Sequence, residues 1–205
     1  MYLGIDIGTS GVKAVIIDGA QSVVDKAGAP LSVSRPQPLW SEQDPASWWR
    51  ATDEAVRKLD SRARRAVKAI GLSGQMHGAT CLDKDDKIIR PAILWNDGRS
   101  GDICAQMMAD MPSLTDITGN LAMPGFTAPK LQWMRAHEPE NFKRVAKVLL
   151  PKDYVRFLMS GDYASDMSDS AGTLWMDVAK RDWSDAVLAL TGLTREHMPT
   201  LYGGS

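Results

Sequence analysis

The sequence of 205 residues has few of the features that mark several large classes of protein. It contains only two cysteines, Cys81 and Cys104, and their spacing fits neither a metal site nor a disulfide framework, which favours two buried thiols in a reduced setting. No apolar run approaches the roughly 20 residues that cross a bilayer, and the first residues lack the basic region and cleavage site of a signal peptide. We therefore expect a cytoplasmic protein with no membrane partner.

An excess of positive charge is also missing. The 24 lysines and arginines are balanced by 25 aspartates and glutamates, so the formal net charge is −1. A protein that binds nucleic acid neutralises many phosphates, and no such partner is expected here. The hydrophobic content of 44% and the charged content of 24% are those of an ordinary globular protein. The length suffices for one sizeable core.

Short β-branched runs open the chain, and helical patterns follow. Strands are expected at residues 2–7, 12–18, 22–26, 67–73 and 147–150. A loop is expected over residues 31–45, and a hairpin over 79–94 around a polar turn at 83–87. Helices are expected at residues 46–59, where Asp44 is the cap, and at about 101–111, 127–137, 154–159 and 184–190. Strands in a meander, followed by alternating helix and strand, predict an α/β fold.

The turn after the first strand is the most informative stretch. Asp6 ends a buried strand, and the glycine- and hydroxyl-rich sequence GTSG begins at Gly8 directly after it. Small residues let successive backbone N–H groups approach an anion closely, and the hydroxyls of Thr9 and Ser10 can donate to phosphate oxygens. Lys13, on the returning strand, can reach the same anion as a point charge. The sequence therefore predicts a phosphate-binding turn.

A carboxylate beside a phosphate is repulsive unless a cation lies between them. Asp6 is therefore expected to organise Mg²⁺, either directly or through its waters. The turn is not a Walker loop, because no Gly-Lys-Ser/Thr follows at the required spacing. The plain alternative is a hairpin turn whose glycines merely permit positive φ, with Asp6 capping its own backbone.

The pattern Asp-x-Gly-Thr-Ser, followed by a strand that bears a lysine, resembles the first phosphate hairpin of the actin and hexokinase superfamily. Other segments resemble the FGGY family of carbohydrate kinases within it: WSEQDP at residues 40–45, LWNDGR at 94–99 and KLQW at 130–133. Ala136 departs from the family's signature at the last of these segments. The resemblance implies a ribonuclease-H-like domain, with a mixed β-sheet flanked by helices, and it implies ATP and Mg²⁺ as cofactors.

The choice of sugar depends on GQMHG at residues 74–78. Glycerol kinases of the family have Arg-Glu where this chain has Met76 and His77, and Gln-Met-His resembles the members that act on xylulose. The resemblance implies that Gln75, Met76 and His77 contact the sugar. A histidine can exchange hydrogen bonds with hydroxyls and a ketose carbonyl without adding a full charge, and a methionine offers an apolar wall. The alternative is a structural turn in which His77 satisfies a backbone carbonyl and Met76 fills the core.

Other candidates are secondary. Asn96 and Asp97 are possible sugar ligands, although a pair formed by Asp97 and Arg99 could instead brace a loop. Three further aspartates lie in runs that resemble the family, but capping and turn formation account for them: Asp153, Asp166 and Asp169.

The resemblance covers residues 1–205 and implies the N-terminal, sugar-binding domain of a kinase that phosphorylates D-xylulose to D-xylulose 5-phosphate. In the family, the catalytic aspartate and the nucleotide pocket belong to a second domain, and no matching segment precedes Ser205. We therefore expect residues 1–205 alone to be inactive, and the full-length enzyme to be a homodimer. The alternatives are an FGGY kinase for another ketose or polyol, and a non-catalytic actin-like binding module.

Overall fold

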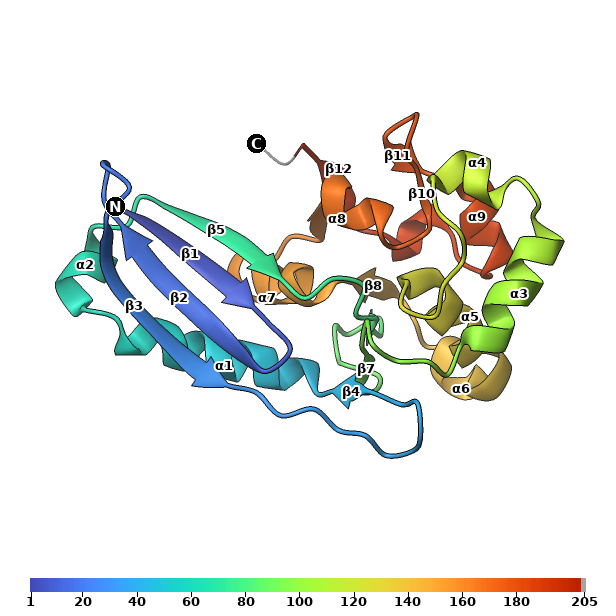
Figure 1. Cartoon of the computed structure of the whole chain (residues 1–205), viewed down its shortest axis with the longest axis horizontal. Coiled ribbons are helices and arrows are strands. Elements are labelled where there is room, and N and C mark those ends of the chain that lie inside the picture. Colours follow the sequence, from blue (N-terminus) through green and yellow to red (C-terminus); the bar gives the residue numbers. More distant parts are fainter. Residues whose placement is uncertain (204–205) are drawn as a thin grey trace.

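The structure, a computed structural model, describes residues 1–203 and has a β-sheet at one end and a group of short helices at the other (Figure 1). The sheet has the strand order β3-β2-β1-β5. Its strands are β1 (Tyr2–Ile7), β2 (Gly11–Ile17), β3 (Val23–Pro30) and β5 (Ala69–Gly74). β1 is antiparallel to β2 and parallel to β5, so the sheet is mixed.

Alternation of side chains gives the sheet one apolar face. Leu3, Ile5 and Ile7 of β1 point into the core, with the inward residues of β2 beside them. Helices α1 (Pro45–Lys58) and α7 (Pro151–Ser160) cover this face. Trp48 of α1 is fully buried there. These contacts form the first of two hydrophobic cores.

The opposite face of the sheet is open within the described part of the chain. Gly4, Asp6 and Lys13 lie on it, and they line a groove of about 890 Å³ that extends from β3 to β5. The end of this groove nearest Asp6 leads to the turn between β1 and β2. This face therefore presents a few polar side chains, among them Asp6 and Lys13, within a surface that is mostly small and apolar.

The second core lies among the helices at the other end of the molecule (Figure 1). Trp175, Met134 and Leu131 are among its most buried members. The helices of this half are α3 (Gly101–Asp110), α4 (Leu114–Thr118), α5 (Thr127–His137), α6 (Pro139–Phe142), α8 (Met167–Ala171) and α9 (Asp185–Leu190), with the 3-10 helix η1 (Arg195–His197). The small helix α2 (Ser61–Arg65) lies beside the sheet.

Further short strands pair in twos outside the four-stranded sheet. They pair as β4 (Glu42–Gln43) with β7 (Ala92–Ile93), β6 (Thr80–Leu82) with β8 (Lys147–Leu149), β9 (Ala164–Asp166) with β12 (Thr200–Tyr202), and β10 (Met176–Asp177) with β11 (Asp182–Trp183). The expected hairpin over 79–94 is thus only partly right. Its turn forms, with the amide of Asp83 donating to Lys87, but its two sides make only isolated bridges to each other.

The other sequence predictions are mostly confirmed. β1 and α5 have the expected bounds, and Asp44 caps α1 by accepting a hydrogen bond from the amide of Ala46. The segment 31–45 is not wholly a loop, because β4 lies within it. Cys81 and Cys104 are buried free thiols. None of the helices in the described residues is long and apolar enough to span a membrane.

Candidate functional site

The turn between β1 and β2 keeps two backbone donors free. The amide of Gly8 donates to the carbonyl of Gly11 at 3.1 Å, which closes the turn. The amides of Thr9 and Ser10 make no hydrogen bond within the described part of the chain. Successive free amides in a tight turn form a concave site for an anion. The amides of this turn can therefore donate hydrogen bonds to phosphate oxygens.

Asp6 lies at the end of β1, beside this turn and on the open face of the sheet. It is opposite Lys13 of β2 and Ser73 of β5 in the strand register. Its carboxylate accepts a hydrogen bond from Ser73 Oγ at 3.0 Å and is otherwise exposed to the groove. Mg²⁺ is commonly held by one or two carboxylates together with waters and substrate phosphates. A single exposed carboxylate next to free amides fits that mode of binding.

Thr9 connects the turn to the segment that follows β5. Its hydroxyl donates to the side-chain carbonyl of Gln75 at 3.1 Å and accepts from Trp95 Nε1 at 3.1 Å. Because a hydroxyl has one hydrogen, the side chain of Thr9 is already used as a donor. The hydroxyl of Ser10 has no such partner among the described residues. The backbone of Thr9 and the side chain of Ser10 thus remain available to an anion.

The buried side chain of Gln43 contacts both Thr9 and Gln75 and supports the bond between them. Gln43 donates from Nε2 to the carbonyls of Thr9 and Ser32, at 2.8 and 3.1 Å. Its Oε1 accepts from Gln75 Nε2 at 2.9 Å and from Trp48 Nε1 at 2.7 Å. Thr9, Gln75 and Gln43 therefore form a closed ring of hydrogen bonds. Both polar atoms of the Gln75 side chain make a hydrogen bond within the protein, and each retains a further site that a sugar hydroxyl could use, the second N–H of Nε2 and the second lone pair of Oε1.

A glycine lets the segment 74–78 lie close to the end of β1. A Cβ added at Gly74 would lie 2.9 Å from the carbonyl oxygen of Ile7, closer than side chains approach backbone. The amide of Gln75 then donates to the same oxygen at 2.7 Å. The ends of β1 and β5 are thereby held together. Met76 follows and is 44% exposed, so it lies on the surface rather than in the core.

His77 is half-buried in a tight surrounding. Its ring lies 4.9 Å from the ring of Phe126, and a Cβ added at Gly172 would lie 2.3 Å from Nε2. Burial, and then the charge of Lys130, lower the pKa of His77 from 6.5 to about 4. The imidazole is therefore neutral at neutral pH and can both donate and accept a hydrogen bond.

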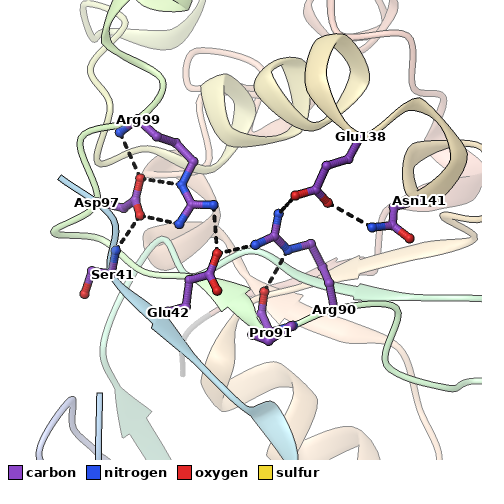
Figure 2. Close-up of polar contacts among 8 residues, drawn as sticks. All are labelled: Ser41, Glu42, Arg90, Pro91, Asp97, Arg99, Glu138 and Asn141. Carbon is purple, nitrogen blue, oxygen red and sulfur yellow. Dashed lines mark hydrogen bonds and ion pairs between the residues drawn. The ribbon is translucent and has the colours of Figure 1, made fainter. Parts of the chain in front are cut away.

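Asn96 and Asp97 have different surroundings in the structure. Asp97 is buried, and its carboxylate accepts from the amide of Ser41 at 2.6 Å and from the amide, Nε and Nη2 of Arg99 at 2.9, 2.9 and 2.7 Å (Figure 2). Both of its oxygens serve to brace the loop, as in the alternative weighed above. Asn96 is exposed and lines a separate groove with residues 35–41. No hydrogen bond among the described residues links either side chain to His77.

Glu42 links the pair formed by Asp97 and Arg99 to a second arginine, Arg90. It pairs with Arg99 at 2.8 Å and with Arg90, which also pairs with Glu138 of the segment after α5 (Figure 2). The Arg99 guanidinium lies over the ring of Trp40 at 3.7 Å. The network therefore connects three segments that carry the family resemblance: residues 40–45, 94–99 and the helix that contains 130–133.

A second ionic cluster lies at the start of α7. Lys152 Nζ is 2.9 Å from a carboxylate oxygen of each of Asp153, Asp166 and Asp169. Burial opposes its charge, but the carboxylates of Asp153 and Asp169 outweigh burial and raise the pKa of Lys152 above its ordinary value. Asp166 also caps α8, as expected, by accepting from the amide of Asp169 at 2.8 Å. Sequence reasoning found the cap and missed the shared lysine, because no local pattern links Lys152 to Asp166.

Three further residues of the site were given no individual role from the sequence. Trp95 is 44% exposed and donates to Thr9, Phe126 packs on His77, and Lys130 is fully buried and donates to the carbonyl of His77 at 2.7 Å. Trp95 and Lys130 lie in the motifs that carry the resemblance. That position was the only signal that could have identified them.

The chain is similar to known carbohydrate kinases. The model of the FGGY family of carbohydrate kinases, N-terminal domain, matches residues 1–205. Xylulose kinase of Escherichia coli (strain K12) is 58% identical over the whole chain, which spans 43% of that protein. A solved structure described as a xyloylose kinase from Brucella ovis has a TM-score of 0.96 and 54% identity, over 98% of this chain and 42% of that one. Xylulose kinase from Rhodospirillum rubrum has a TM-score of 0.92 and 29% identity over similar shares, 98% and 42%.

Proposed function

The chain belongs to the FGGY family of carbohydrate kinases, and from this we propose that it forms the sugar-binding part of an enzyme that phosphorylates D-xylulose with ATP. The chain spans 43% of the Escherichia coli relative, so the activity of the whole protein is part of the proposal. One observation carries it. The phosphate turn and the segment 74–78 lie at adjacent strand ends and are joined by the hydrogen bond between Thr9 and Gln75.

The surroundings of His77 support a neutral sugar as the acceptor. Its uncharged imidazole can bind hydroxyl groups, while the exposed thioether of Met76 offers an apolar surface to the carbon face. An anionic acceptor would be expected to face a fixed positive charge, and segment 75–77 supplies none. The names of the relatives favour D-xylulose among neutral sugars.

The turn and the carboxylate beside it support ATP as the donor. The free amides of Thr9 and Ser10, the hydroxyl of Ser10 and the ammonium of Lys13 would bind phosphate oxygens. Asp6 would hold Mg²⁺ through its waters. When bound, the ion neutralises charge on the phosphates. Phosphoryl transfer depends on positioning and charge neutralisation, and the ring formed by Thr9, Gln75 and Gln43 would fix the distance between the two sites.

The product of the complete gene tests this proposal. ADP release with D-xylulose, glycerol or D-gluconate as acceptor should give the highest kcat/KM for D-xylulose. His77→Ala should lower that kcat/KM by about tenfold or more, the loss expected when a hydrogen-bonding group in the pocket is removed. His197→Ala is the matched control, since within residues 1–203 the hydrogen bonds of the His197 ring go to Thr194 at the start of the 3-10 helix. A preference for glycerol, or equal activity of both variants, would overturn the assignment of the sugar.

A further inference from the structure

Lys130 occupies a position that is unfavourable for a cation. Its side chain is fully buried, and no carboxylate among the described residues lies within ion-pair distance of it. It belongs to the first part of α5, where the helix dipole also opposes positive charge. Burial lowers the pKa of Lys130 from 10.5 to about 7. A methionine of similar length would avoid this desolvation, so packing alone does not account for a lysine.

The amine joins two backbone segments. Lys130 Nζ donates to the carbonyl of His77 at 2.7 Å and to the carbonyl of Gly125 at 2.7 Å. Thr127 Oγ1 adds a weaker bond to the same carbonyl of His77, at 3.2 Å. His77 has a φ of 64°, in the left-handed region that a histidine adopts only when its surroundings enforce it. A tight turn closed by the amide of Gly78, which donates to the carbonyl of Met76 at 2.8 Å, holds this conformation together with the bonds to the His77 carbonyl.

The two segments that Lys130 joins hold opposite parts of one pocket. His77 projects its ring from the first segment, and Phe126 follows Gly125 and packs against that ring. Gly172 leaves the space into which Nε2 of His77 points. Rotation about the N–Cα bond of His77, which changes φ, would move its carbonyl and its ring together. The position of the imidazole thus depends on where the Lys130 amine holds the backbone.

We propose that Lys130 is a positioning residue, whose amine joins the carbonyls of His77 and Gly125 and so fixes the His77 imidazole for the sugar. The part that concerns the sugar rests on the function proposed above. The part that concerns the backbone of His77 does not. Lys130 acts through His77 and need not touch the substrate.

Nuclear magnetic resonance of the ¹⁵N-labelled chain tests the backbone directly. A residue with positive φ has a short distance between its own amide and Hα protons, and hence a strong intraresidue nuclear Overhauser effect. Lys130→Met removes the amine at nearly constant length and should weaken this effect at His77. Leu131→Ala is the matched control, because Leu131 is a buried neighbour on α5 that belongs to the second core. It should lower stability and leave the effect at His77 unchanged.

Calorimetric titration with D-xylulose tests the consequence. Lys130→Met should raise Kd by about tenfold or more, since a displacement of 1 Å in a positioned group can cost up to a hundredfold. Leu131→Ala should change Kd less than twofold, and Thr127→Val, which removes the weaker bond, should have a smaller effect in the same direction as Lys130→Met.

The outcomes distinguish the positioning role of Lys130 from the proposal that D-xylulose is the sugar. An unchanged His77 signal in Lys130→Met, or equal losses of affinity in Lys130→Met and Leu131→Ala, would overturn the positioning role. If Lys130→Met does not fold, Thr127→Val provides the test. An unaltered nuclear Overhauser effect at His77 and an unaltered Kd for D-xylulose would count against the positioning role. If the unsubstituted chain binds no D-xylulose, the proposed sugar is wrong, and the signal of His77 still decides the role of Lys130.

Discussion

The hydroxyl of Thr9 donates to the side-chain carbonyl of Gln75 at 3.1 Å, across 66 positions of sequence. Thr9 belongs to the turn after β1, and Gln75 belongs to the segment after β5. These strands are parallel neighbours, so their carboxyl ends meet at one edge of the sheet. The bond connects the residues proposed for phosphate with those proposed for sugar, and binding at one site can therefore affect the other.

Thr9→Val should disrupt this connection. The substitution keeps the shape of the side chain but leaves Gln75 Oε1 without a donor and Trp95 Nε1 without an acceptor. We expect the affinity for D-xylulose to fall by about tenfold or more, because two hydrogen bonds are lost and each contributes about three- to tenfold. Thr9→Ser retains the hydroxyl and should bind the sugar as the unsubstituted chain does. Calorimetric titration measures both, and equal affinities of the two variants would contradict the connection.

His77 should make stability depend on pH. Folding lowers its pKa to about 4, so between pH 6.5 and pH 4 the unfolded chain binds a proton that the folded chain does not. The stability that this neutral ring contributes is complete above pH 6.5 and is lost as the pH falls towards 4. The loss should be roughly 1 kcal/mol after allowance for solvent screening of a half-buried ring.

His77→Gln provides the comparison, because glutamine does not titrate in this range. Urea unfolding of both proteins at pH 7 and at pH 5 gives the difference. The unsubstituted chain should lose more stability than His77→Gln on going to pH 5. An identical pH dependence in the two proteins would show that the ring is already hydrated.

The sequence identified local features well and distant contacts poorly. The strand 2–7, the helix 127–137 and the Asp44 cap are set by short-range periodicity and capping, and the structure confirms them. The ribonuclease-H-like fold was expected from the motif that contains Asp6, and the likeness to solved kinases confirms it. Local patterns, however, carry no information on which strands pair across the chain. The pairing of β6 with β8 in place of a simple hairpin was missed for that reason.

The candidate site shows the same limit. The segments 74–78 and 94–99 were identified, but the sequence could not tell which of their side chains point outward. Asp97, offered as a sugar ligand, is turned inward to Arg99, while its neighbour Trp95 is exposed and bonds to Thr9. Alternation along an irregular loop has no fixed period, so direction had to come from the structure.

Glu42→Gln should destabilise the fold strongly. It removes the carboxylate shared by Arg90 and Arg99, both of which are largely buried. Removal of one partner from a buried ionic network leaves uncompensated charge and costs about 3 kcal/mol or more. Asp53→Asn, which breaks an exposed pair with Arg57, should cost about 0.5 kcal/mol or less. Urea unfolding compares them, and similar losses would show that the network contributes no more than a surface pair.

Lys152→Met should lower the free energy of unfolding, and the loss should be smaller at acidic pH. Three carboxylates would be left together without their cation, at a cost of about 3 kcal/mol near pH 7. Protonation removes their repulsion, so the difference from the unsubstituted chain should shrink as the pH falls to 4.5. Lys143→Met, at an exposed pair with Glu140, is the control and should show little effect at either pH. A difference for Lys152→Met that stays constant with pH would contradict the shared-charge account.

The most direct test of the account is to map where the chain binds D-xylulose. In a titration of the ¹⁵N-labelled chain, the amides of residues 75–78 and the indole N–H of Trp95 should shift together and saturate with one Kd. Glycerol at the same concentrations should shift them less. Shifts confined to other parts of the chain, or no saturable shift at residues 75–78, would contradict the assignment of this segment to the sugar.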